Sequence, residues 1–229
     1  MGGRLKLSVI IPAYNERKTI LEVIDRVRKV DLALDVIVVD DGSTDGTREL
    51  LAGAEWPDVR TFFHQKNSGK GSAIRTGVEH ANGDYVIIQD ADLEYDPCEY
   101  PKLLAPLLAR QADVVYGSRF RGNLKRMSLV QRIGNRFLTV VTNLLYGVSL
   151  SDMETCYKVV PVAVIKRLNL RSRGFEFEPE ITAKLLRRGH RILEVPITYT
   201  ARDASQGKKI DWRHGWPALK TLIKYRFVD

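Results

Sequence analysis

Three carboxylates, Asp90, Asp92 and Glu94, closely follow a short apolar run at residues 85–88. The run has the length and composition of a buried strand and is too short for most helices. If the chain stays extended beyond it, side chains two residues apart point to the same side, which brings three negative charges together. Like charges repel unless a cation neutralises them, and Mg²⁺ and Mn²⁺ prefer oxygen ligands. The spacing predicts a metal site that bridges to a phosphate, although an isolated Asp-x-Asp is more often a solvated turn.

Polar residues also follow the other expected strands. Glu16, Asp41 and Arg119 each come shortly after an apolar run of strand length. Open α/β sheets bind ligands at the carboxyl ends of their strands. Charged or polar residues at four strand ends on one edge therefore predict a ligand site there.

A glycine-rich turn at residues 67–71 carries Lys70 at the start of an expected helix. Helix N-termini and lysines suit phosphate groups. The turn lacks the full P-loop pattern, which argues against a nucleoside triphosphatase of that class. No G-x-G-x-x-G follows the first strand, which argues against a dinucleotide-binding dehydrogenase.

Strands and helices alternate in the first half of the chain, which predicts a mostly parallel α/β sheet with right-handed crossovers. The expected strands are residues 7–12, 36–39, 59–63, 85–88, 113–116 and, near the end, 192–199. The expected helices are residues 17–30, one capped by Ser43 or Thr44, 71–81, 101–108, 127–148 (one helix, or two broken near Gly134), 176–188 and 212–227. We expect a single domain at residues 1–229.

Charge is divided unevenly between the two halves. Residues 1–113 carry 14 Lys and Arg against 19 Asp and Glu, whereas residues 114–229 carry 22 against 9. Residues 114–151 contain no acidic side chain. This segregation favours a surface that faces phosphates or an anionic membrane over a generally basic surface.

The sequence shows no signal peptide, and two cysteines imply no disulfide framework, so we expect a cytoplasmic protein. The longest uncharged stretch has 15 residues, short of the about 20 needed to span a bilayer. The helix at residues 212–227 combines Trp212 and Trp216 with cations, which suits peripheral contact with an anionic membrane. A core-packed helix would show the same pattern.

Three segments together resemble the family-2 glycosyltransferases of the GT-A fold: SVIIPAYNE at residues 8–16, VVDDGSTD at 38–45 and QDADLE at 89–94. Within that family the chain most resembles the polyprenyl-phosphate (dolichol-phosphate) mannose and glucose synthases. The match runs from about residue 6 to about residue 199. By this resemblance residues 1–113 form the nucleotide-sugar half and residues 114–229 the acceptor half.

The resemblance also implies site residues. Pro12, Tyr14, Glu16 and Asp41 would line the nucleotide pocket. Asp90 and Asp92 would hold the metal, Mg²⁺ or Mn²⁺, and the diphosphate, with Glu94 completing the metal shell. Asp90, Asp92 and Arg119 would be the catalytic residues, and Arg119 would face the acceptor phosphate.

Further basic side chains complete the predicted site. Lys70 and Arg202, the latter in a loop at residues 201–209 of the length of a lid, would neutralise the donor diphosphate; Lys208 and Lys209 in the same loop are further candidates. Arg132 and Arg136 lie one turn apart and can grip the acceptor phosphate together, or form a solvated helix face. Glu176, Glu178 and Glu180 load the start of a helix, where acidic residues stabilise the N-terminus.

The expected activity is inverting, metal-dependent transfer of mannose or glucose from GDP-mannose or UDP-glucose to a polyprenyl phosphate. An alcohol acceptor needs a general base, whereas a phosphate is already ionised. No base is evident in the sequence, which favours the phosphate. The alternatives are transfer to a hydroxyl of a glycan or small molecule, and a non-catalytic basic module that binds membranes. No motif supports nucleic-acid binding.

Overall fold

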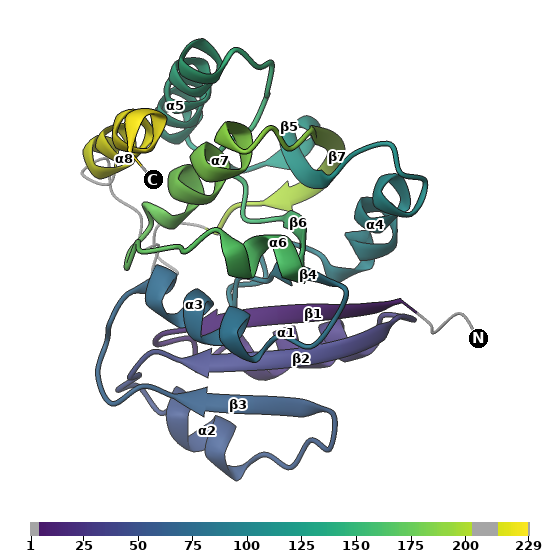
Figure 1. Ribbon diagram of the computed structural model, residues 1–229. Coiled ribbons are helices and arrows are strands. Elements are labelled where there is room, and N and C mark those ends of the chain that lie inside the picture. The colour runs from purple at the N-terminus through teal and green to yellow at the C-terminus, as the bar shows by residue number, and fades with distance from the viewer. Residues whose placement is uncertain (1–4, 203–214, 229) are drawn as a thin grey trace.

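A seven-stranded sheet in the order β3-β2-β1-β4-β6-β5-β7 forms the centre of the protein (Figure 1). The computed structural model describes residues 5–202 and 215–228. The strands are β1 (Lys6–Ala13), β2 (Ala33–Asp40), β3 (Val59–Phe63), β4 (Tyr85–Ile88), β5 (Val114–Lys125), β6 (Lys158–Pro161) and β7 (Ile192–Thr200). The helices are α1 (Ile20–Arg28), α2 (Thr47–Gly53), α3 (Lys70–His80), α4 (Tyr100–Leu108), α5 (Leu129–Tyr146), α6 (Val162–Arg167), α7 (Phe177–Arg187) and α8 (Gly215–Phe227), with a 3₁₀ turn, η1 (Pro97–Glu99).

The sheet is mostly parallel, as the alternating pattern predicts. β1 pairs in parallel with β2 and β4, and β2 pairs in parallel with β3. β6 is antiparallel to both β4 and β5, while β5 and β7 are parallel. The sequence did not predict β6, because a four-residue strand that begins with Lys158 carries little apolar signal.

Buried apolar runs explain the central strands. Leu7, Val9, Ile10 and Ile11 of β1 have no exposed surface, as expected of a parallel strand covered on both faces. Figure 1 shows α3 in front of β1 and β2 and α1 behind them. Because both faces are covered, the ends of these strands remain as the places where polar side chains can gather.

The helix after β2 begins later than predicted. α2 starts at Thr47, and its N-cap is Gly46 at φ 97°, so neither Ser43 nor Thr44 caps it. The Ser43 hydroxyl instead accepts a hydrogen bond from the backbone N–H of Asn15 (2.9 Å). This bond joins the loops that follow β1 and β2.

Residues predicted as one long helix or two form the single helix α5, which passes Gly134 without a break. Its inner face packs on α8 in a small cluster that includes Leu138, Met153 and Leu222. α8 confirms the expected C-terminal helix from Gly215 onward, whereas Trp212 lies outside the described residues. No helix in residues 5–202 and 215–228 is long and apolar enough to cross a bilayer.

Helix α3 approaches β1 through a glycine. A Cβ added at Gly77 would lie 2.4 Å from Cγ2 of Ile10, which is fully buried in β1. Real Cβ atoms do not come so close, so the helix and strand pack at this distance only with glycine between them.

We predict that Gly77→Ala lowers the free energy of unfolding by about 1–3 kcal/mol, the usual effect of overpacking a core. The matched control is Gly134→Ala, since a Cβ at Gly134 of α5 meets nothing within 4 Å. That variant should be more stable by about 0.5–1 kcal/mol, because glycine inside a helix is unfavourable relative to alanine. Urea unfolding measures both, and shifts of equal sign would contradict the packing described.

Candidate active site at the carboxyl edge of the sheet

The ends of β1, β2 and β4 bring the predicted donor residues to one edge. Asp40 is the register partner of Ala13, and the N–H of Asp41 donates to the carbonyl of Ala13 (2.8 Å). On the other side of β1, Gln89 donates to the carbonyl of Ile10 (2.8 Å). The sheet therefore places the end of β1, which includes Pro12, and the loop after it, which carries Tyr14 and Glu16, between Asp41 and Asp90.

Arg202 contacts three carboxylates that are all more than 100 residues away from it in the sequence. Its guanidinium pairs with Glu16 (Nη1 to Oε2, 3.0 Å) and with Asp92 (Nη2 to Oδ2, 3.2 Å). Its backbone N–H donates to Oε1 of Glu94 (2.7 Å). Among the described residues, its buried Nε has no hydrogen-bond partner, which leaves a charged donor available beside the carboxylates.

Lys70 neutralises the remaining carboxylate of this group. Its Nζ lies 2.6 Å from Oδ1 of Asp90, and both side chains are less than one-fifth exposed. The glycines on either side of Lys70 allow a close backbone approach. A Cβ at Gly69 or Gly71 would strike the backbone of residues 172–173, and the N–H of Ser72 donates to the carbonyl of Arg173 (3.1 Å). The turn therefore packs against the segment before α7.

The segment after β4 is not extended, so the predicted one-sided arrangement of three carboxylates is wrong. Leu93 has φ 63°, and the N–H of Glu94 donates to Oδ1 of Asp92 (3.1 Å). This turn directs Glu94 to the hydroxyl of Tyr199 and the backbone of Arg202. Within residues 5–202 and 215–228, no three His, Cys, Asp or Glu side chains converge to hold a metal ion.

Asp90 and Asp92 are nevertheless suited to a divalent cation, because two neighbouring carboxylates are more stable with a cation than without one. Burial, together with the charges of Asp90 and Glu94, raises the pKa of Asp92 to about 8. The charge of Arg202 opposes this rise without cancelling it, and a divalent cation would favour the ionised form further. Two aspartates leave the other positions of a metal shell to water and substrate, as Mg²⁺ sites commonly do.

Asp41 is held rigidly by three donors. Its Oδ1 contacts Nδ1 of His64 (2.7 Å) and accepts from the N–H of Ser68 (3.0 Å). Its Oδ2 accepts from the N–H of Gly69 (2.7 Å). Asp41 is 2% exposed, so these bonds fix the position of a charge at the edge of the predicted nucleotide pocket.

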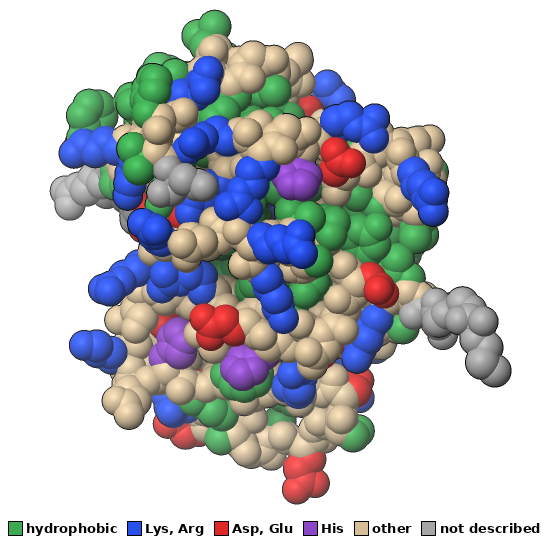
Figure 2. Space-filling model, viewed as in Figure 1, with side chains coloured by type: hydrophobic (Ala, Val, Ile, Leu, Met, Phe, Trp, Pro, Cys, Tyr) green, Lys and Arg blue, Asp and Glu red, His purple; other side chains and the backbone are tan. Residues whose placement is uncertain are grey.

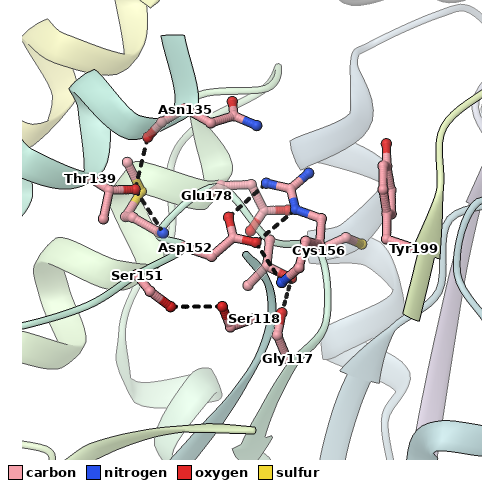
Figure 3. Close-up of polar contacts among 12 residues, drawn as sticks. Gly117, Ser118, Asn135, Thr139, Ser151, Asp152, Cys156, Glu178 and Tyr199 are labelled. Carbon is pink, nitrogen blue, oxygen red and sulfur yellow. Dashed lines mark hydrogen bonds and ion pairs between the residues drawn. The ribbon is translucent and has the colours of Figure 1, made fainter. Parts of the chain in front are cut away.

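Arg119 is buried and forms a bidentate ion pair. Its Nε and Nη2 donate to the two oxygens of Asp152, each at 2.7 Å, and its backbone N–H donates to the same carboxylate (2.9 Å). The guanidinium carbon of Arg119 lies 5.2 Å from the ring centroid of Tyr199, and Figure 3 shows Asp152 near the centre of the view with Tyr199 to its right. The sequence did not indicate this partner, which is 33 residues away.

The other predicted acceptor residues lie on α5. The guanidinium carbon of Arg136 lies 4.9 Å from the ring centroid of Phe120, whose other neighbour is Arg119 at 6.0 Å. Arg132 lies one turn earlier on α5 and is exposed. The structure thus brings Arg119 and Arg136 to the same aromatic ring.

A buried pair of opposite charges beside Lys70 was not predicted from the sequence. Nζ of Lys158 lies 2.5 Å from Oε2 of Glu178, and Nζ of Lys70 lies 3.9 Å from Oε1 of the same carboxylate. Glu176 and Glu180 instead accept from backbone N–H groups of residues 171–174, as expected near a helix start. The signal that could have found Glu178 is the lysine in β6, since a buried lysine needs a counter-charge.

Glu154 is a second carboxylate that the sequence reasoning missed. Burial raises its pKa to about 7, with the charge of Glu178 adding to the effect and that of Lys158 opposing it. Its Oε1 is buried without a hydrogen-bond partner in the part of the chain that the structure describes. A carboxylate that exchanges its proton near neutral pH can act as a general base.

The sequence profile of glycosyl transferase family 2 matches residues 8–168. The chain belongs to this family. Its membership favours an enzyme over the non-catalytic basic module. The carboxylate edge formed by β1, β2 and β4 lies inside the matched range, whereas Arg202 and α7 lie beyond it.

Two relatives cover most of this family-2 chain. Glycosyltransferase AglJ of Haloferax volcanii is 34% identical over 207 residues, which are 89% of this chain and 66% of that protein. The undecaprenyl-phosphate mannosyltransferase of Micrococcus luteus is 30% identical over 215 residues, 89% of this chain and 87% of that one. The chain thus spans less than two thirds of the Haloferax protein's length.

A solved structure confirms the fold. Glucosyl-3-phosphoglycerate synthase of Mycobacterium tuberculosis, crystallised with Mn²⁺, UDP-glucose and phosphoglyceric acid, has a TM-score of 0.72 and 24% identity. The match covers 99% of this chain and 81% of that chain. The family-2 chain therefore has the GT-A-like fold, a mostly parallel sheet flanked by helices.

The raised pKa of Glu154 predicts a pH-dependent stability. Its carboxyl binds a proton more tightly when folded than when unfolded, so its contribution is fully present below about pH 4.5 and is lost as the pH rises through about 7. Glu154→Gln removes this loss. We expect the stability of the variant, relative to wild type, to be greater at pH 8 than at pH 5 in urea unfolding. The exposed Glu55→Gln should show no such pH dependence, and an equal difference at both pH values would contradict the burial of Glu154.

Proposed function

We propose that this family-2 transferase moves a hexose, mannose or glucose, from a nucleotide-sugar to a polyprenyl phosphate. The observation that carries the proposal is the carboxylate edge, in which Lys70 and Arg202 neutralise Asp90, Asp92 and Glu16. Beside it lies a basic half with no acidic residue between residues 114 and 151. The 30% identity to an undecaprenyl-phosphate mannosyltransferase supports the acceptor.

The donor would bind at the edge formed by β1, β2 and β4. Pro12, Tyr14, Glu16 and Asp41 would line the pocket for the base and ribose, and either GDP-mannose or UDP-glucose fits this proposal. Asp90 and Asp92 would hold Mg²⁺ or Mn²⁺, which stabilises the negative charge on the leaving diphosphate. Glu94 contacts Tyr199 and the backbone of Arg202, so we assign it to orienting Arg202 rather than to holding the metal.

Lys70 and Arg202 would stabilise the negative charge that develops on the leaving diphosphate. Each now pairs with an aspartate. With a cation on those aspartates, Lys70 and Nη2 of Arg202 would be released from them to donate to diphosphate oxygens, together with the unpartnered Nε of Arg202, while Nη1 would stay on Glu16. Preorganised donors of this kind favour the transition state because charge grows where they point.

The acceptor phosphate would lie on the side of β5 and α5. Arg132 and Arg136 would bind its oxygens, and Arg119, with two of its nitrogens on Asp152, would present its third. A phosphate oxygen is already ionised, so it can attack the sugar directly, which inverts the anomeric centre. In this proposal residues 1–113 serve the donor and residues 114–229 the acceptor, in a cytoplasmic enzyme that meets the membrane peripherally.

Glu154 favours a second candidate function, transfer to a hydroxyl of a glycan or small molecule. Its pKa of about 7 suits the general base that such an acceptor needs. In that case the carboxylate would take the proton of the hydroxyl as the oxygen attacks the sugar. A panel of nucleotide-sugars with Mn²⁺, offered polyprenyl phosphate and hydroxyl acceptors in parallel, separates the two functions.

The donor assignment predicts that Asp92→Asn abolishes transfer and leaves the fold intact. The amide cannot supply the negative charge that a divalent cation requires. Turnover, Mn²⁺ binding by calorimetry and thermal melting would be measured together. Glu55→Gln, an exposed carboxylate away from the site, is the control. Near-normal activity of Asp92→Asn would move the metal elsewhere.

The acceptor assignment predicts that Arg136→Ala reduces kcat/KM for polyprenyl phosphate and leaves donor affinity unchanged. Losing a charge-assisted hydrogen bond costs about 1.5–3 kcal/mol, roughly a ten- to hundredfold loss. Glu154→Gln should retain transfer to the phosphate, because no base is needed. If Glu154→Gln loses transfer to a hydroxyl acceptor and Arg136→Ala keeps that transfer, the hydroxyl acceptor is the correct one.

A further inference from the structure

Helix α5 exposes a continuous apolar stripe to solvent. Six side chains form it, with exposed fractions from 53% at Val140 to 80% at Leu144. They are Leu129, Val130, Ile133, Phe137, Val140 and Leu144. At 100° per residue these positions fall within one sector about 100° wide, the width of a face that normally packs against something.

The stripe is a second face, because α5 is already packed on the first. Leu138, Thr139 and Thr142 are its buried residues and lie on the other side of the helix. The cluster with α8 uses Leu138, and the hydroxyl of Thr139 accepts from the N–H of Met153 (3.1 Å). A helix that is apolar on two faces needs a partner beyond those that the structure describes.

Helix α8 extends the exposed apolar surface beside α5. Trp216, Ile223 and Phe227 are exposed on it, Phe227 at 75%. Figure 2 shows hydrophobic side chains interspersed with Lys and Arg at the upper left, where Figure 1 places α5 and α8. We refer to the stripe on α5 with these residues of α8 as the outer surface.

The charges of the outer surface select its partner. Neither α5 nor α8 contains an acidic residue. The cations among them are Arg132, Arg136, Lys220, Lys224 and Arg226. Two copies of this chain meeting at the surface would bring these cations together, which is unfavourable. An anionic lipid bilayer accepts both the apolar side chains and the cations around them.

We propose that the outer surface is a docking site for an anionic lipid bilayer, with α5 lying along the membrane plane. The inference rests on the proposed function, to which it adds the face that meets the lipid. Through its inner side α5 contacts Met153, next to the Asp152 that pairs with Arg119. Arg136 lies between the stripe and Arg119, on the ring of Phe120. A phosphate at the lipid surface would thus meet Arg136 before the buried site.

The test uses the triple variant Val130→Gln, Ile133→Gln and Leu144→Gln, which removes apolar side chains and leaves every charge in place. These residues are 61–80% exposed, so the fold should be retained, as thermal melting will show. The matched control is Leu21→Gln with Leu108→Gln, exposed apolar residues on α1 and α4. Co-sedimentation with phosphatidylcholine vesicles, with and without phosphatidylglycerol, measures partitioning of the full chain.

We expect wild type to bind the vesicles that contain phosphatidylglycerol, with binding that weakens as salt rises. The triple variant should partition at least about tenfold less, because three apolar side chains no longer enter the lipid. The control should bind as wild type does. Turnover of the triple variant on a short, water-soluble prenyl phosphate should be unchanged.

Three results would overturn the proposal. They are equal binding of wild type and the triple variant, no binding of wild type to anionic vesicles, and a wild-type dimer in sedimentation equilibrium that the triple variant loses. The last result would assign the outer surface to a second copy of the chain. Vesicle binding that depends on the stripe, in a protein that transfers to no prenyl phosphate, would support the docking surface and contradict the proposed acceptor.

Discussion

The gathering of negative charge at the carboxyl edge of the sheet is the constraint on which the site depends. Glu16, Asp90 and Asp92 follow the ends of two strands. Like charges that are largely buried need cations beside them. The protein supplies them itself, with Lys70 on Asp90 and Arg202 on Glu16 and Asp92. These cations offset part of the repulsion, although burial still raises the pKa of Asp92 to about 8.

The same solution recurs deeper in the second half. Arg119 is matched by Asp152, and Lys158 by Glu178, each pair buried. Removing one member of such a pair leaves an uncompensated charge and is strongly destabilising. Helix α5 contacts this buried layer through Thr139 and Met153 and exposes its other face. It therefore connects the charged interior to the outer surface.

The sequence predicts the parts of the fold that local pattern controls. β4 matches its expected bounds, because a short apolar run flanked by polar residues predicts a buried strand. The carboxylates lie at the strand ends as expected, but their directions do not follow from spacing, since Leu93 adopts a left-handed conformation that turns Glu94 away. The partners of Arg119 and Glu178 lie 33 and 20 residues distant, and only the folded chain brings them together.

The position of the metal is the most direct test of this account. A crystal of the protein grown with Mn²⁺ and a nucleoside diphosphate would locate the metal by its anomalous scattering. The account predicts Mn²⁺ on the carboxylates of Asp90 and Asp92, with Lys70 and Arg202 moved from them onto the diphosphate. Manganese bound elsewhere, with both ion pairs unchanged, would contradict it.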